Sequence, residues 1–501
     1  MKPGQASPSH GSANHVSLIN KSDPVIAVIV AEGRCGMTDN ANAISITATE
    51  LAKLTADFRS VLAKSHGNIN GRVVIPAAQV EQYISRYCAM SGNISIAESP
   101  TIDISGLHIE GPFVFPPGGY PAMDVHNTIF DNKATFRDVI FHGKVDFKSI
   151  GDGSHNTEII FRNVQFHDVA NFDNANLYRA SFKEGILFEG KASFKSAHCG
   201  EMEDITFKGY SDFSHAILGS IRKSIFLKGA LFDQIDAGDL RITESVFHGS
   251  ASFKSLKVSV LNLATVEFKS DALFTGSVIS NDCAISGTRF LQWCDFSDCE
   301  FSGPILFSLN TFMQVPRFYK VTMYPDVSFH GPQFKCFKSI EDANAYAELR
   351  KLVPSQDGEF FAYEQRARAN AMLKQKWGFS LTALVSKAYD YASGYGQSIV
   401  RPALGLLGTI ILAWLIFSKT SLSNYIHASE GRAHWTQDMD AAFGLVLQNV
   451  FNPVAFWGKE PPFVSDLASV VYLSIVQTVL SLGFITLLLL AIRRKFRKGS
   501  E

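Results

Sequence analysis

The chain lacks a dominant charge, a disulfide pattern and any recognisable catalytic signature. Its 501 residues carry 46 Lys plus Arg against 47 Asp plus Glu, which argues against a basic nucleic-acid stripe and against a uniformly acidic surface. Seven Cys residues, an odd number in a long chain, do not indicate a disulfide framework. The sequence contains no Walker loop, no dinucleotide-binding glycine pattern, no nucleophile elbow and no H-E-x-x-H pair. We therefore expect a protein that is not an enzyme and has no metal, cofactor or nucleic-acid ligand.

What the chain does contain is a pattern of phenylalanines that recurs about every 20 residues between residues 130 and 318. The Phe residues come in pairs, and a small residue usually lies two positions before the second Phe of each pair. A fixed period of this length is typical of a stacked solenoid. The pairs are Phe141/Phe147, Phe166/Phe172, Phe188/Phe194, Phe207/Phe213, Phe226/Phe232, Phe247/Phe253, Phe268/Phe274 and Phe290/Phe296.

Two stretches reveal a five-residue step within this period. The chain reads A-N-F-D-N, A-N-L-Y-R, A-S-F-K-E over residues 170–184 and C-D-F-S-D, C-E-F-S-G over residues 294–303. Neither helical spacing nor strict alternation produces such a step, whereas four steps can close one square coil. The central Phe or Leu and the small residue before it would then point inward. The expected core includes Phe172, Leu177, Phe182, Phe232, Phe253, Phe274, Phe296 and Phe301.

These stretches resemble the pentapeptide-repeat family, whose unit is A-(D/N)-L-x-x with Phe often replacing Leu. The resemblance covers roughly residues 101–335 and implies a right-handed quadrilateral β-helix. Some members of that family are strongly acidic DNA mimics. This solenoid carries Lys148, Lys195 and Lys254 directly after inward Phe residues, so it lacks the uniform acidic face of a mimic. Cys294 and Cys299 occupy small inward positions, where Cys serves as a small hydrophobe.

On either side of the repeat the five-residue pattern ends and helical patterns appear. Thr101 opens the β-helix, and residues 77–89 before it are expected to be helical, in a small α/β segment that caps one end. After residue 335 the pattern becomes helical, with helices expected over 340–353 and 359–376. Side chains expected to pack on the last coil are Phe360, Phe361 and Tyr363, and those expected to face water are Glu364, Arg366, Arg368 and Lys374.

Two apolar segments, residues 399–417 and 467–492, are long enough to cross a membrane as helices. Basic residues cluster before the first segment and after the second, and no signal peptide is evident, so both termini and the β-helix are expected in the cytoplasm. Residues 441–450 of the external loop could form a short re-entrant helix. The charges that set this topology are Arg401, Arg493, Arg494, Lys495, Arg497 and Lys498.

The predicted fold class is mainly β, a pentapeptide-repeat solenoid with a small N-terminal α/β cap and a C-terminal α-helical two-span membrane region. The layout resembles a bacterial group of pentapeptide-repeat proteins with two C-terminal spans, which implies an inner-membrane location. The predicted segments are a disordered tail (1–20), the α/β cap (21–100), the β-helix (101–335), a helical cap and connector (336–398), transmembrane helix 1 (399–417), the external loop (418–466), transmembrane helix 2 (467–492) and a basic tail (493–501).

A polar stripe at helical spacing on the second apolar segment leaves two functions open. Such a stripe either holds helices together or lines a water path. The leading hypothesis is a membrane protein in the lipid bilayer whose cytoplasmic β-helix is a scaffold for a protein partner. The alternative is a homo-oligomeric pore or ion-channel-like effector, gated or assembled through the rod. The stripe consists of Ser474, Gln477, Thr478 and Ser481.

Overall fold

The computed structural model describes most of the chain from residue 53 onward. The described residues are 53–58, 60, 68–69, 72–91, 100–151, 158–323, 327–375, 380–428, 440–451, 463–465 and 467–498. The predicted disordered tail over residues 1–20 lies outside them, and the predicted α/β cap over residues 21–100 is described only in part.

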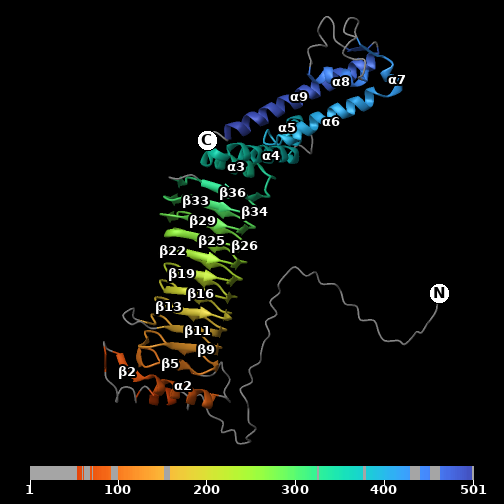
Figure 1. Ribbon diagram of the computed structural model, residues 1–501. Coiled ribbons are helices and arrows are strands. Elements are labelled where there is room, and N and C mark those ends of the chain that lie inside the picture. Colours follow the sequence, from red (N-terminus) through yellow and green to blue (C-terminus); the bar gives the residue numbers. More distant parts are fainter. Residues whose placement is uncertain are drawn as a thin grey trace, which may run out of the picture. The chain divides into compact units, whose positions relative to one another are not determined.

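Residues 102–334 form a parallel β-solenoid of about 11 turns, which confirms the predicted fold class (Figure 1). One side of the coil is a ten-stranded parallel sheet of two-residue strands, and each strand pairs with the equivalent strand of the next turn. Its strands are β3 (Ile102–Asp103), β7 (Met123–Asp124), β10 (Val145–Asp146), β12 (Ala170–Asn171), β15 (Ala192–Ser193), β18 (Ser211–Asp212), β21 (Ala230–Leu231), β24 (Ala251–Ser252), β27 (Ala272–Leu273) and β31 (Cys294–Asp295).

The other sides of the coil are strands that stack turn upon turn in the same parallel manner. They are β5 (Phe113–Phe115), β6 (Gly118–Tyr120), β9 (Ala134–Phe141), β11 (Ile159–Phe166), β13 (Asn176–Lys183), β14 (Ile186–Phe188), β16 (His198–Glu203), β17 (Ile205–Phe207), β19 (Ile217–Arg222), β20 (Ile225–Phe226), β22 (Asp236–Thr243), β23 (Val246–Phe247), β25 (Lys257–Ala264), β26 (Glu267–Phe268), β28 (Val278–Ile279), β29 (Cys283–Ser286), β30 (Arg289–Phe290), β32 (Glu300–Phe301), β33 (Ile305–Ser308), β34 (Thr311–Phe312), β35 (Thr322–Met323), β36 (Val327–His330) and β37 (Gln333–Phe334).

The five-residue step places one large side chain of each unit inside the coil. In the turn built from β12, β13 and β14, the four central residues are all buried. They are Phe172, Leu177, Phe182 and Phe188. Equivalent rings of successive turns lie face to face, with ring centroids 4.8 Å apart for Phe172 and Phe194 and 4.9 Å apart for Phe232 and Phe253. The interior is therefore a set of continuous side-chain ladders that run along the solenoid axis.

Two corners of each turn use left-handed backbone, which L residues other than Asn and Asp adopt only at a cost. At one corner a residue with φ between 50° and 61° recurs in turn after turn, and Gly takes its place in some turns. The occupants are Asp138, Asn163, Glu184, Asp204, Lys223, Glu244, Thr265, Gly287, Leu309 and Gly331. The free energy gained by burying the side-chain ladders offsets the cost of this backbone conformation at the corners.

The N-terminal end of the solenoid is covered by α2 (Ala77–Ser91) and by a small sheet of β1 (Asn68–Ile69), β2 (Arg72–Pro76), β4 (Leu107–Glu110) and β8 (Ile129–Phe130). Val80, Ile84 and Tyr87 of α2 are buried in the same hydrophobic core as the ladders. Glu81 accepts a hydrogen bond from the backbone N–H of Val114 at 2.8 Å, which fastens α2 to β5.

The C-terminal end is covered by α3 (Ile340–Leu352), a 3-10 turn (Pro354–Gln356) and α4 (Asp357–Gln375). Phe360 packs against Phe329 and Phe334 of the last turn, with ring centroids 5.6 and 5.8 Å away. Tyr346 of α3 is buried beside Cys336 and donates to its carbonyl oxygen at 3.0 Å. Both open ends of the coil are thus closed by helices.

The remaining elements form a helical hairpin. It contains α5 (Leu381–Ser393), α6 (Val400–Phe417), α7 (Thr420–Ser423), β38 (Ile426–Ala428), α8 (Ala441–Phe451), β39 (Phe463–Ser465) and α9 (Ala468–Lys498). The two long helices α6 and α9 run side by side (Figure 1). They approach closely at Gly405, where any larger side chain would collide with the ring of Phe484.

Candidate functional site

The surface of the solenoid is interrupted at one corner because two successive turns are short. Ala170 pairs with Ala192 after 22 residues, but Ala192 pairs with Ser211, and Ser211 with Ala230, after only 19. The missing residues come from one corner. The strands β16 and β19 have 6 residues, whereas β13 before them and β22 after them have 8. The register between β13 and β16 shifts accordingly between Leu177 and Ser181.

The shortened corners leave a hollow of about 820 Å³ between two full-length corners, which we name the corner groove. Gly200 and Gly219 form part of its floor, and a Cβ atom at Gly219 would lie 2.9 Å from the carbonyl oxygen of Gly200. The corner groove is lined by Tyr178, Arg179, Ala180, Ser181, Lys183, His198, Cys199, Gly200, Glu201, Ile217, Leu218, Gly219, Ser220, Ala237, Gly238, Asp239 and Arg241.

The walls of the corner groove combine aromatic, apolar and charged groups. Tyr178 is 61% exposed and lies against His198, with ring centroids 4.7 Å apart. Burial lowers the pKa of His198, which favours the neutral form of its imidazole. Lys183 and Arg241 have carboxylate partners within the corner groove, Glu201 and Asp239. Arg179 makes no ion pair within the described part of the chain, so the lining carries one uncompensated positive charge.

The second feature with functional potential is the apolar exterior of the hairpin. The helices α6 and α9 have 18 and 31 residues, or about 27 and 46 Å of helix, against a hydrocarbon core of about 30 Å. Both are long and apolar enough to cross a membrane. Large apolar side chains cover their outer surfaces, which is unusual for a surface in contact with water. Examples are Leu404 at 62%, Leu412 at 60%, Val479 at 64% and Leu489 at 60% exposed.

The predicted polar stripe of α9 faces the interior of the hairpin. Gln477 is 5% exposed, accepts a hydrogen bond from Asn449 Nδ2 at 2.8 Å and donates to the Val446 carbonyl oxygen at 3.1 Å. Asn449 and Val446 belong to α8, so Gln477 binds the short helix to the long one. A second amide, Gln448, donates to the carbonyl of Phe463 and accepts from its N–H, which joins α8 to β39.

The hydroxyl groups of the polar stripe make fewer hydrogen bonds than the Gln477 amide does. Thr478 Oγ1 donates to the Ser474 carbonyl oxygen at 2.8 Å, within α9 itself. Ser474 and Ser481 are fully buried, and their hydroxyl oxygens have no partner among the described residues. The structure thus brings Ser474, Gln477 and Ser481 together on the buried side of α9.

The sequence did not reveal the ion pairs that connect the cap helices to the hairpin. Arg366 of α4 makes a two-pronged contact with Asp390 of α5, at 2.8 and 2.7 Å. Arg401, at the start of α6, donates to the backbone carbonyl of Asp390 at 3.0 Å. These residues lie on different helices and belong to no repeating pattern, so only their charges could have suggested a pairing.

Two expectations about α4 were wrong. Glu364 is buried rather than facing water, because Arg350 and Arg368 each approach its carboxylate to 2.7 Å. Phe361 does not pack on the last coil. Its ring lies instead near Tyr395, at 6.5 Å between centroids, and under the guanidinium of Arg350, at 4.9 Å.

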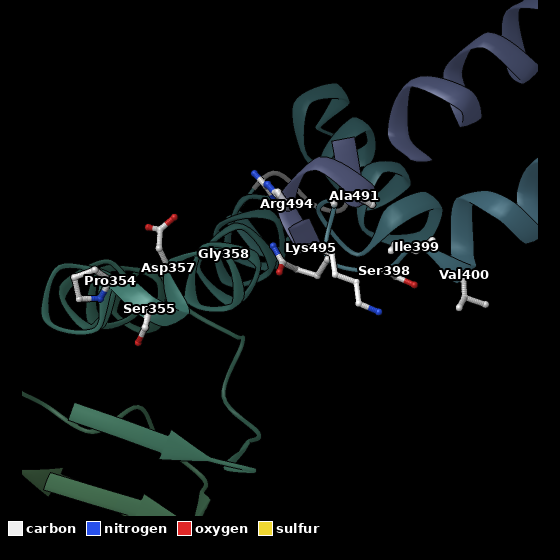
Figure 2. A pocket seen from close by; sticks show the side chains of 12 residues that line it. Pro354, Ser355, Asp357, Gly358, Ser398, Ile399, Val400, Ala491, Arg494 and Lys495 are labelled. Carbon is white, nitrogen blue, oxygen red and sulfur yellow. The ribbon is translucent and has the colours of Figure 1, made fainter. Parts of the chain in front are cut away.

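A cavity of about 700 Å³ lies where the cap helices meet the hairpin, and we name it the junction cavity. Figure 2 shows its lining, which comes from three places: the start of α4, the segment leading into α6 and the end of α9. Arg494 donates to the Tyr395 carbonyl oxygen at 2.6 Å. The lining residues are Pro354, Ser355, Asp357, Gly358, Gly396, Gln397, Ser398, Ile399, Val400, Ala491, Arg494 and Lys495.

The predicted topology charges fall at this end of the hairpin. Arg494 and Lys495 line the junction cavity, whereas Arg493 is exposed outside it and Arg401 contacts Asp390. Arg497 and Lys498 are the next basic positions along α9, which extends through residue 498 rather than ending at 492. The basic tail is therefore a continuation of the apolar helix.

Comparison of the chain with protein-family models, with curated proteins and with solved structures finds no match in any of the three.

Proposed function

We propose that this protein is a membrane-anchored scaffold whose solenoid binds a protein partner at the corner groove. The corner groove is the observation that carries the proposal. It hollows an otherwise regular coil, and it combines an exposed aromatic ring, a glycine floor and Arg179, which has no ion-pair partner among the described residues. Tyrosine and arginine are the residue types most enriched where interfaces concentrate their binding energy. We assign no catalytic step to the protein.

The exposed apolar surfaces of α6 and α9 support the membrane part of the proposal. A water-soluble protein rarely exposes so many large apolar side chains on two adjacent helices, whereas lipid tails would cover them favourably. The basic residues gathered at one end of the hairpin support a cytoplasmic location for that end, and with it for the solenoid. We further propose that the coil is a bacterial pentapeptide-repeat β-helix, because its inward residues follow the five-residue unit.

Site-specific photocrosslinking in cells tests the binding surface. A photoreactive amino acid at Tyr178 of the full chain should form one discrete adduct with a partner protein, and Arg179→Glu should reduce that adduct at least tenfold. Tyr210 provides the matched control, because it is also 61% exposed on the solenoid but does not line the corner groove. Equal adducts from positions 178 and 210, or no adduct from position 178, would contradict the assignment.

The contacts of the polar stripe favour a scaffold over a pore. The Gln477 amide is occupied by two hydrogen bonds within its own chain, both to α8. A side chain engaged in this way stabilises the hairpin and is not free to coordinate a passing ion.

A further inference from the structure

We propose that the junction cavity binds the phosphate headgroup of an anionic membrane lipid, with one acyl chain lying along α6. The inference rests on the proposed insertion of α6 and α9 in a bilayer. The junction cavity lies at the ends of both helices, where headgroups would surround the protein. Its volume of about 700 Å³ is in the range of roughly 300–1,000 Å³ usual for ligand pockets.

The charge of the junction cavity favours an anion. Arg494 and Lys495 extend from the end of α9 beside the segment that leads into α6 (Figure 2). Neither makes an ion pair with a described residue, and Lys495 is exposed. The single acidic side chain of the lining, Asp357, is already paired with Arg350 at 2.9 Å. Lys495 is therefore left to meet a ligand, and Arg494 adds a second positive charge, although one of its nitrogens donates to the Tyr395 carbonyl.

The start of α6 adds to this positive character. Its first residue is Val400, and the N-cap residue, Ile399, has an apolar side chain that cannot accept a hydrogen bond from the first turn. The side chain of Ser398 accepts a hydrogen bond from the N–H of Arg401 at 3.2 Å, and Pro402 has no N–H. The positive end of the helix dipole therefore lies at Ile399 and Val400, which line the junction cavity together with Arg494 and Lys495.

The apolar part of the lining distinguishes a lipid from a soluble phosphate. Ile399, Val400 and Ala491 give the junction cavity an apolar side. From there an exposed apolar strip continues along α6, with Val400 65%, Leu404 62% and Leu407 51% exposed. A ligand that has a phosphate at one end and a hydrocarbon chain at the other matches this arrangement, in which a basic cavity leads to an apolar strip. Basic cavities between helices on the cytoplasmic side are suited to such headgroups.

Native mass spectrometry of the full-length protein in detergent tests this inference. The protein is titrated with phosphatidylglycerol, with phosphatidylcholine and with glycerol 3-phosphate. We expect one tightly bound phosphatidylglycerol per chain, and about fivefold weaker binding in Lys495→Gln, in keeping with the usual contribution of one basic residue near anionic lipid. Arg493→Gln is the matched control, since it removes the same charge from the same helix outside the junction cavity.

Each other outcome would overturn the inference. Equal loss of affinity in Arg493→Gln and Lys495→Gln would indicate a diffuse charge effect, and equal affinity for phosphatidylcholine would remove the headgroup preference. Glycerol 3-phosphate binding as tightly as the lipid would indicate a soluble-phosphate site.

Arg494 also contacts Tyr395, so the exposed Lys495 is the safer position to change. Membrane insertion is measured separately by alkaline extraction, and its failure would contradict the proposed function itself.

Discussion

At the scale of single residues, the inward position of each five-residue unit determines whether the coil forms. Phe232 is fully buried in mid-solenoid, between Phe213 at 5.0 Å and Phe253 at 4.9 Å in the same ladder. Its neighbour Leu231 points the other way and is 41% exposed. Adjacent positions at the end of β21 therefore have opposite surroundings, as expected from the alternation of side chains along an extended chain.

This contrast yields a paired prediction. Phe232→Ala should lower the free energy of unfolding by about 3–5 kcal/mol, and Phe232→Asp should prevent the solenoid from folding, because a buried carboxylate in this ladder has no partner. Leu231→Asp, at the neighbouring exposed position, should change stability by less than about 0.5 kcal/mol. Circular dichroism and denaturant unfolding measure all three variants. Similar behaviour of the two Asp variants would refute the inward assignment of Phe232.

At the scale of elements, the C-terminal cap protects the last turn of the solenoid. Cys336 is buried beneath α3, with its sulfur 3.5 Å from the hydroxyl of Tyr346. Burial raises the pKa of the Cys336 thiol to about 11, so almost none of it is the reactive thiolate at neutral pH. The reactivity of Cys336 therefore reports whether the cap is seated.

We expect Phe360→Ala to destabilise the seating of α4 by about 3 kcal/mol, because Phe360 fills the space above Phe329 and Phe334. Alkylation of Cys336 under native conditions should then become faster than in the unchanged protein. Cys294, buried in mid-solenoid, is the internal control and should stay unreactive in the same sample. Peptide mass mapping after a short pulse of reagent distinguishes the two sites. Unchanged protection of Cys336 would show that Phe360 is not needed to seat the cap.

At the scale of the whole molecule, the contacts of the polar stripe of α9 bear on the choice between a scaffold and a pore. If α6 and α9 span a membrane as proposed, two spans per chain cannot enclose a water path, so a pore would need several copies. The scaffold needs a single chain whose amides are satisfied internally, which is how Gln477 and Asn449 are arranged.

We therefore expect the protein purified in detergent to be monomeric and, in liposomes, to conduct no ions. Gln477→Leu should still conduct no ions. It should lower the thermal stability of the protein, because the side chain of Asn449 loses its hydrogen-bond acceptor. Size-exclusion chromatography with light scattering measures the oligomeric state, and ion-flux assays on the liposomes measure conductance. A ring of four or more chains with a conductance that changes in Gln477→Leu would favour the pore instead.

Much of the fold was predictable because each turn repeats the same inward side chains. The Phe172, Phe194 and Phe213 positions could be read from the sequence, since burial imposes the same residue type at every turn. The corner groove was not predicted, although its signal was present as a change of repeat length from 22 to 19 residues. The pairing of Arg366 with Asp390 left no such signal, because a single contact between two helices is not repeated along the chain.

The ladders also set the length of the solenoid in discrete increments. Each turn adds one strand spacing, about 4.8 Å, and every corner of one turn lies over the same corner of the next. Gain or loss of a complete turn would therefore preserve the register of all ladders. The two 19-residue turns show that residues can also be removed from a corner while the ladders stay continuous. The coil can thus act as a ruler whose reach changes by whole turns and whose recognition surface changes by trimming corners.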